Sequence, residues 1–230
     1  MPPTIKICGL STADTLDAAL NAGADMIGLV FFEKSPRYVG LDEARALGDQ
    51  ARGRAHIVAL SVDPSNDKLA DIMRVLNPDF LQLHGSESPQ RVAEIRGLFG
   101  IPTIKAIGVA GPQDFARASD YAATADWLLI DAKPPKGAAL PGGNGVAFDW
   151  RLARDFAPAK PWLLSGGLNA DNVAQAIALS GARGVDVSSG VENAPGVKDG
   201  GMIVAFIEHA RAAFASLLPP TGEGVTTRPT

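Results

Sequence analysis

Short runs of apolar residues alternate along the chain with longer amphipathic stretches. The apolar runs predict eight β-strands, at residues 4–8, 26–31, 56–62, 80–84, 103–107, 127–131, 162–165 and 184–188. The intervening stretches predict helices that begin near Thr12, Leu41, Ser65, Ser88, Pro112, Asp149, Asn169 and Asp199. Regular alternation of strand and helix is typical of a parallel sheet whose strands are joined by helical crossovers.

The number of strand–helix units bears on whether the sheet is closed. Eight units within 230 residues favour an α/β fold with a single-domain (β/α)8 barrel, the TIM barrel. The alternative is an open doubly wound sheet, which usually has about five or six strands. We expect the barrel to occupy residues 1–217. Residues 218–230 are rich in Pro, Gly and Thr without periodicity, and we expect a disordered tail there.

The composition narrows the possible partners. The formal net charge is −4, and no basic stripe of the kind found in nucleic-acid binders is evident, so we expect no nucleic-acid partner. No stretch approaches the roughly 18 consecutive apolar residues of a membrane span, and residues 1–15 lack the pattern of a signal peptide. The single cysteine, Cys8, allows no intramolecular disulfide. We therefore expect a cytoplasmic protein, either a monomer or a weak homodimer.

Polar residues mark the carboxyl ends of several predicted strands, where the active sites of such barrels lie. The first strand ends in Cys8, the fourth in His84 and the sixth in Asp131, and the eighth carries Asp186. Side chains alternate between the two faces of a strand, and these residues fall opposite apolar neighbours. By the same parity we expect three further polar residues to face the barrel mouth: Lys6, Gln82 and Lys105.

Two glycine-containing segments follow the seventh and eighth strands and indicate a phosphate site. The first contains Gly166 and Gly167, and the second contains Ser188, Ser189 and Gly190. Glycine lets a backbone approach a ligand closely, and exposed N–H groups in such turns bind anions. Barrels often bind phosphate with these two loops and a short extra helix, for which residues 192–197 leave room. An ordinary tight turn is the alternative.

Five segments together resemble the phosphoribosylanthranilate isomerase family, across residues 4 to about 209. A sixth, looser segment combines residues 142–145 with 148–150. All six occur in the family's order. The five closer ones are Lys6-Ile7-Cys8-Gly9, the run 28–38 that ends in Lys34-Ser35-Pro36-Arg37-Tyr38, Leu81-Gln82-Leu83-His84-Gly85, the run 163–169 around Ser165-Gly166-Gly167-Leu168-Asn169, and the run 185–192 around Ser188-Ser189-Gly190.

The resemblance implies an Amadori rearrangement in tryptophan biosynthesis, in which N-(5-phosphoribosyl)anthranilate becomes 1-(2-carboxyphenylamino)-1-deoxyribulose 5-phosphate. It implies Asp131 as the acid that opens the furanose ring and Cys8 as the base that removes the proton from C2. A cysteine base must be a thiolate part of the time, and Lys6 is a candidate cation to favour that form. Arg37 is expected to bind the anthranilate carboxylate. His84 and Asp186 are expected to line the same pocket.

The reaction has no net redox change, so we expect no cofactor, and a small phosphorylated substrate as the only partner. The residues also leave other interpretations open. Another phosphate-binding barrel enzyme would keep the two glycine-containing segments that bind phosphate. Candidates are a histidine-pathway isomerase, an indole-glycerol-phosphate synthase or an FMN-dependent oxidoreductase. A non-catalytic sugar-phosphate-binding protein would keep only the phosphate site. The three histidines are far apart in sequence and no paired cysteines occur, so we expect no metal site. The Pro- and Gly-rich loop 133–145 is a candidate lid.

Overall fold

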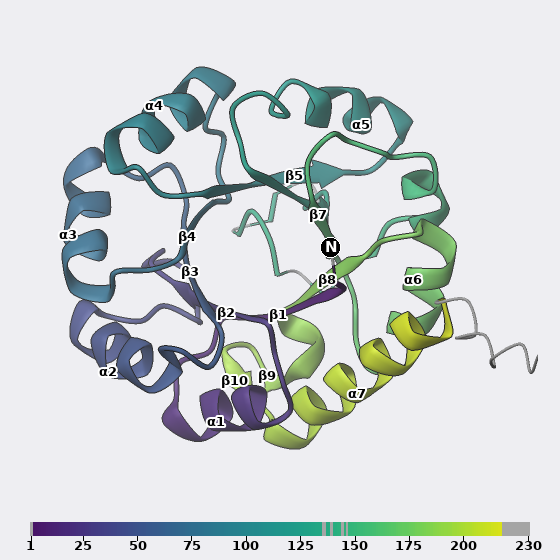
Figure 1. Cartoon of the computed structure of the whole chain (residues 1–230), viewed down its shortest axis with the longest axis horizontal. Coiled ribbons are helices and arrows are strands. Elements are labelled where there is room, and N and C mark those ends of the chain that lie inside the picture. Colours follow the sequence, from purple (N-terminus) through teal and green to yellow (C-terminus); the bar gives the residue numbers. More distant parts are fainter. Residues whose placement is uncertain (1, 135–136, 139, 144, 146, 218–230) are drawn as a thin grey trace, which may run out of the picture.

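A computed structural model describes residues 2–134, 137–138, 140–143, 145 and 147–217. Eight parallel strands, each paired with the next in chain order, close into a barrel because the eighth also pairs with the first. Figure 1 shows the barrel end-on. The strands are β1 (Thr4–Cys8), β2 (Met26–Val30), β3 (His56–Ser61), β4 (Phe80–Leu83), β5 (Thr103–Val109), β6 (Trp127–Ala132), β7 (Trp162–Leu164) and β8 (Gly184–Val187). The predicted barrel is confirmed, with strand ends within two residues of expectation. The predicted tail, residues 218–230, lies outside the described residues.

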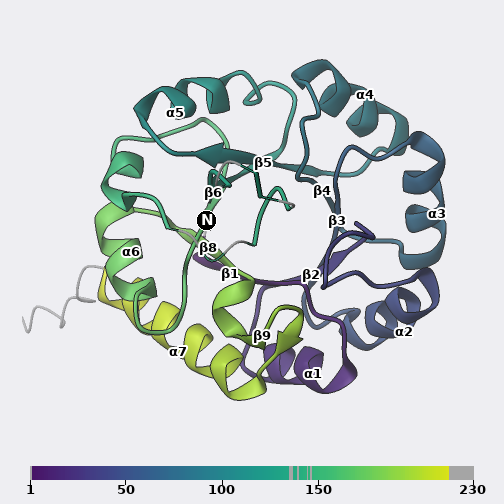
Figure 2. The same ribbon diagram turned by 180° about the vertical axis from the view of Figure 1, so that it is seen from behind.

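Helices surround the barrel, as the view from behind in Figure 2 also shows. Several begin where a side chain caps the first turn: Thr12, Ser65 and Ser88 each accept a hydrogen bond from a backbone N–H three residues later. The helices are α1 (Ala13–Asn21), α2 (Leu41–Ala51), α3 (Asn66–Leu76), α4 (Pro89–Phe99), α5 (Pro112–Ser119), α6 (Val173–Ser180) and α7 (Gly200–Ser216). None of those in the described part of the chain combines the length and apolar character that a membrane crossing requires.

The prediction of an α-helix near Asp149 is wrong. The segment forms only a short 3-10 helix, Trp150–Ala153, which Asp149 caps by accepting from the Arg151 backbone N–H. Pro158 and Pro161 follow within a few residues and cannot donate backbone hydrogen bonds, so a longer helix has no room before β7. The helix expected near Asn169 begins later, at Val173.

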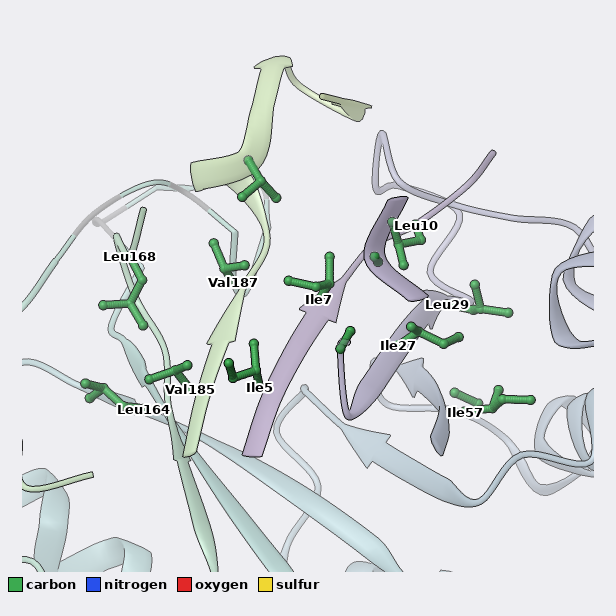
Figure 3. Close-up of a cluster of buried hydrophobic side chains, with 14 of the residues drawn as sticks. Ile5, Ile7, Leu10, Ile27, Leu29, Ile57, Leu164, Leu168, Val185 and Val187 are labelled. Atoms are coloured by element: carbon green, nitrogen blue, oxygen red, sulfur yellow. The ribbon is translucent and has the colours of Figure 1, made fainter. Parts of the chain in front are cut away.

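The main apolar core lies between the barrel and the helices. Figure 3 shows part of it, with Ile5 and Ile7 of β1 beside Val185 and Val187 of β8. A smaller cluster of Met26, Val58, Ile104, Ala106, Leu129 and Leu163 occupies the opposite faces of the strands, inside the barrel. The expected parity therefore holds for β1, β4, β6 and β8, whose apolar side chains at alternate positions belong to the outer core.

Strand β5 has the opposite parity, so the expectation that Lys105 faces the barrel mouth is wrong. Ile104 and Ala106 fill the interior instead, where apolar contacts are available. Lys105 points to the helix side and is 2% exposed. Its Nζ donates to the backbone oxygens of Leu83 and Gly85, at 3.2 and 2.7 Å, and to Glu87 Oε2 at 2.7 Å. The buried ion pair thus ties β5 to the loop after β4.

We expect Lys105→Met to lower the free energy of unfolding by about 3–5 kcal/mol, because it leaves the buried carboxylate of Glu87 without its cation. Urea unfolding followed by circular dichroism measures the change. Lys68→Met is the matched control, since Lys68 makes an exposed pair with Glu33 and its loss should cost less than about 1 kcal/mol. Equal losses for the two variants would contradict the role of burial.

The short extra helix expected within residues 192–197 is also absent. A 3-10 helix, Ser189–Val191, comes directly after β8, and two antiparallel strands follow, β9 (Glu192–Ala194) and β10 (Val197–Lys198). Pro195 and Gly196 form the turn between them, and Gly196 has φ of 82°. Proline and a glycine with positive φ favour a tight turn over a helix.

Candidate active site

A cavity of about 790 Å³, counted to its open mouth, lies at the carboxyl ends of the strands. All ten residues proposed from the sequence line it: Cys8, Arg37, His84, Asp131, Gly166, Gly167, Asp186, Ser188, Ser189 and Gly190. Cys8 ends β1 and Asp131 is near the end of β6, so the two approach the cavity from different sides of the barrel.

Cys8 lies beside a buried ion pair. Lys6, two residues earlier on the same face of β1, is fully buried, and its Nζ donates to Asp186 Oδ1 at 2.6 Å. Ser165 donates to the other oxygen of Asp186, Oδ2, at 3.1 Å. Burial lowers the pKa of Lys6, but the charge of Asp186 and the contact with Cys8 outweigh it and raise the pKa overall. Lys6 is therefore an ammonium ion.

The charges around Cys8 act in opposite directions. Burial is the largest influence and raises the pKa of the Cys8 thiol, and the carboxylate of Asp186 acts in the same sense. The positive charges of Lys6 and Lys198 oppose this increase without overcoming it. Lys6 thus favours the thiolate, as expected, but most of the Cys8 thiol is protonated at neutral pH and only a minor fraction is the thiolate.

We expect the thiolate absorbance of the unliganded protein to develop with a midpoint above the ordinary cysteine pKa of about 8.5. Because Cys8 is the only cysteine, a titration followed near 240 nm reports this group alone, with Cys8→Ser as the blank. A midpoint well below the ordinary value would contradict the dominance of burial.

Asp131 is held by two neighbours and is 7% exposed. Its Oδ1 accepts from the backbone N–H of Ala132 at 2.8 Å, and its Oδ2 lies 3.3 Å from Nε2 of His84. The other ring nitrogen of His84, Nδ1, lies 3.0 Å from the side-chain nitrogen of Gln82. Gln82 and His84 therefore support Asp131 from the neighbouring side of the cavity. Gln82 faces the barrel interior, as expected, with its Oε1 lacking a partner among the described residues.

Arg37 is buried rather than solvated, at 5% exposure. Its Nε and one terminal nitrogen donate to the two carboxylate oxygens of Glu192, at 2.7 and 2.8 Å, in a forked pair. Its side chain passes against Gly9, where a Cβ atom would lie 2.6 Å from Cδ of Arg37. Gly9 also has φ of 78°, so this position requires glycine for both space and conformation.

The loops after β7 and β8 form a glycine-lined wall of the cavity. Gly166 and Gly167 have φ of 90° and 67°, and their backbone N–H groups donate to no acceptor among the described residues. At Gly190, a Cβ atom would overlap the backbone oxygen of Leu168. These positions leave backbone donors near the cavity, which is the chemistry that binds phosphate.

The family model described as N-(5'phosphoribosyl)anthranilate (PRA) isomerase matches residues 5–209. The chain belongs to this family. A relative from Rhodopseudomonas palustris (strain BisB18), N-(5'-phosphoribosyl)anthranilate isomerase, is 58% identical over 213 residues, which are 93% of this chain and 98% of the relative. The family therefore accounts for the fold and for nearly the whole sequence.

Two solved structures extend the comparison. One is a phosphoribosyl anthranilate isomerase in complex with reduced 1-(o-carboxyphenylamino)-1-deoxyribulose 5-phosphate, with a TM-score of 0.78, 33% identity and coverage of 92% of this chain and 100% of that chain. The other shows monomers generated from the dimeric isomerase of Thermotoga maritima, with the same TM-score, identity and coverage. Members of the family thus share this barrel at one-third identity.

Sequence reasoning missed several charged residues of the site. Glu192 falls within a motif but was given no role, and Lys198 and Glu87 were not considered. Glu192 acts through Arg37, which lies 155 residues away in the chain. Lys198 and Glu87 have nearer partners, 6 and 18 residues away. Their charge in an otherwise apolar or turn-forming segment was the only available signal.

Proposed function

We propose that the chain catalyses the isomerisation of N-(5'-phosphoribosyl)anthranilate, with Asp131 as general acid and Cys8 as general base. The main observation behind this proposal is that a thiol from β1 and a carboxyl group from β6 line one cavity whose wall is rich in glycine backbone. The identity with isomerases of the family supports the same conclusion. The reaction moves hydrogen within one molecule, so its atoms and electrons balance without a co-reactant.

In the proposed first step, the protonated carboxyl group of Asp131 gives its proton to the furanose ring oxygen. The bond between C1 and that oxygen breaks, and the nitrogen lone pair of the anthranilate amine forms the C1=N bond of an iminium ion. His84, 3.3 Å from the carboxyl group of Asp131, holds that group in place.

In the proposed second step, the thiolate of Cys8 removes the proton from C2. The electron pair of the C–H bond forms a C1=C2 double bond, and the C1=N electrons return to nitrogen. The enol then gains a proton at C1 from the Cys8 thiol and loses its C2 hydroxyl proton to the Asp131 carboxylate, which gives the ketone and restores both groups. Lys6 supports this step because its ammonium group stabilises the thiolate.

The two ends of the substrate are assigned to different groups of residues in the cavity. We assign the phosphate to Gly166, Gly167, Ser188, Ser189 and Gly190, whose backbones line one wall. The anthranilate carboxylate is assigned to Arg37, because a charged guanidinium group with N–H donors not used by Glu192 binds a carboxylate strongly. His84 keeps its proposed place beside the substrate. Both oxygens of Asp186 already accept hydrogen bonds, so we assign it to holding Lys6 as well as lining the pocket.

The test is turnover of freshly prepared phosphoribosylanthranilate, followed by the loss of its fluorescence. We expect the protein to speed the loss of this fluorescence, and we expect 1-(2-carboxyphenylamino)-1-deoxyribulose 5-phosphate to form as the product. Binding of the substrate without turnover would overturn the proposal in favour of a sugar-phosphate-binding protein.

The proposal includes a reduced Cys8 thiol and therefore a reducing compartment such as the cytoplasm. It also includes a monomer or a weak homodimer, and sedimentation equilibrium measures which of them forms. The described parts of the 133–145 loop line the cavity at Lys133, Pro134, Leu140–Gly143 and Gly145. The remainder of the predicted lid, at 135–136, 139 and 144, lies outside the described residues.

A further inference from the structure

Three charged side chains form a buried cluster at the edge of the cavity, and the chemistry proposed above does not use two of them. Glu192 accepts from Arg37 through both carboxylate oxygens, and its Oε1 also accepts from Nζ of Lys198 at 2.7 Å. The side chains of Glu192 and Lys198 are 4% and 1% exposed. One carboxylate thus joins two cations away from water.

Lys198 in turn is fixed to the loop after β8. Its Nζ donates to the backbone oxygen of Ser188 at 2.9 Å and lies 3.3 Å from the Ser188 hydroxyl oxygen. Burial is the largest influence on Lys198 and leaves its pKa below the ordinary value despite Glu192. The cluster therefore runs from the loop proposed to bind phosphate to the arginine proposed to bind the carboxylate.

The β9–β10 hairpin holds this cluster in place. Glu192 begins β9 and Lys198 ends β10, and their residues pair across the hairpin. The turn residue Gly196 donates its backbone N–H to Glu192 Oε2 at 3.2 Å. A Cβ atom at Gly196 would overlap the backbone oxygen of Pro36, the residue before Arg37. The hairpin is thus packed directly against the loop that carries the arginine.

We propose that Glu192 is a positioning residue that orients Arg37 for the substrate carboxylate, and that Lys198 fixes Glu192 in that orientation. The inference rests on the proposed function of this cavity. Glu192 engages Nε and one terminal nitrogen of Arg37, and that terminal nitrogen also donates to the backbone oxygen of Gly143 at 3.3 Å. The other terminal nitrogen donates to no acceptor among the described residues, so we assign its N–H donors to a ligand. Glu192 does not line the cavity, so it acts on the substrate through Arg37.

The charges of the cluster are consistent with this role. Burial raises the pKa of Glu192, but the hydrogen bonds from Arg37 and the charge of Lys198 outweigh it and leave the pKa below its ordinary value. Glu192 is therefore a carboxylate across the neutral range. With Lys198 present, the cluster of two cations and one anion keeps a net positive charge, so Arg37 still attracts an anionic ligand.

The test compares two ligands that differ in one group. The first is reduced 1-(o-carboxyphenylamino)-1-deoxyribulose 5-phosphate, and the second is the same compound without the carboxylate, made from aniline. We expect Glu192→Gln to weaken binding of the first about tenfold, and of the second less than about threefold, because only the carboxylate depends on the forked geometry. Isothermal titration calorimetry measures both dissociation constants.

A double-mutant cycle shows whether Glu192 acts through Arg37. In an Arg37→Ala background, Glu192→Gln should no longer change the preference for the carboxylate-bearing ligand. Glu192→Asp keeps the charge but is one methylene group shorter, so it cannot reach both cations. We expect Glu192→Asp to prefer the carboxylate-bearing ligand less than the wild-type protein does and more than Glu192→Gln does. If Glu192→Gln does not fold, Glu192→Asp replaces it in the test.

Several outcomes overturn the inference. Tighter binding of the carboxylate-bearing ligand to Glu192→Gln would mean that Glu192 competes with the substrate. Equal weakening of both ligands would mean a general structural role, as would failure of both Glu192 variants to fold. The binding assay needs no turnover, so an inactive wild-type protein that keeps the ligand preference would defeat the proposed function and leave this inference intact.

Discussion

Cys8→Ser lowers kcat by about 10²–10⁴-fold, the range that a positioned general base contributes. A serine hydroxyl group fills nearly the same space but does not ionise near neutral pH, so it cannot take the proton from C2. The substitution does not touch the pair of Lys6 and Asp186, in which Nζ of Lys6 donates to Oδ1 of Asp186 at 2.6 Å. The loss is therefore one of chemistry rather than of fold. Steady-state turnover of phosphoribosylanthranilate measures it.

The control for this variant is binding of the reduced product analogue, which is acyclic and needs no base. Its dissociation constant should change less than about threefold, and urea unfolding should give nearly the wild-type midpoint. Cys8→Ala should be as inactive as Cys8→Ser. A Cys8→Ser protein that retained kcat within about threefold would exclude the thiol as the base.

Asp131→Asn is expected to lower kcat by a similar factor, about 10²–10⁴-fold, because an amide has no acidic proton to give to the ring oxygen. The amide keeps the shape of the carboxyl group, so the contacts with His84 and the Ala132 backbone N–H remain sterically possible. The acyclic product analogue has no ring to open, and its affinity should be nearly unchanged. Turnover and calorimetry together separate the two effects.

Asp114→Asn is the matched control for removal of a buried carboxylate. Asp114 is 3% exposed, caps α5 by accepting from the backbone N–H groups of Ala110 and Gly111, and does not line the cavity. We expect it to lose about 1 kcal/mol of stability and no activity. If Asp114→Asn lost as much kcat as Asp131→Asn, the loss at Asp131 would reflect stability rather than acid catalysis.

Cys8→Ser and Asp131→Asn also distinguish this isomerase from another barrel enzyme with the same phosphate loops. Such an enzyme would keep its activity through other groups and would lose little on changing both Cys8 and Asp131. Loss of isomerisation in each variant, with binding of the phosphorylated analogue kept, is the pattern that the proposed pair of acid and base requires.

The strand–helix order of this protein was predictable because a closed parallel barrel needs regular alternation, and apolar periodicity records it directly. The gathering of Cys8, His84 and Asp131 at one cavity was predictable for the same reason: parallel strands present their carboxyl ends at one edge. The six motif segments added the family, and with it the roles of acid and base that we propose.

Other features depended on contacts that no local pattern contains. Lys105 alternates with apolar residues as Cys8 does, yet β5 places it on the helix side, where Glu87 from another loop compensates its charge. The helix expected near Asp149 gave way to a 3-10 turn, because nearby prolines leave too little chain to build it.

By itself, the sequence determined the barrel, the family and ten of the residues that line the cavity. Only the tertiary structure decided which charges meet: Lys6 with Asp186, and Arg37 with Glu192 and Lys198. The physical reason is that apolar periodicity is a property of residues close together in sequence. The partner of a buried charge is instead any opposite charge that folding brings within a few ångströms. The direction of the Cys8 pKa follows from the same fact, because burial and three separate charges set it together.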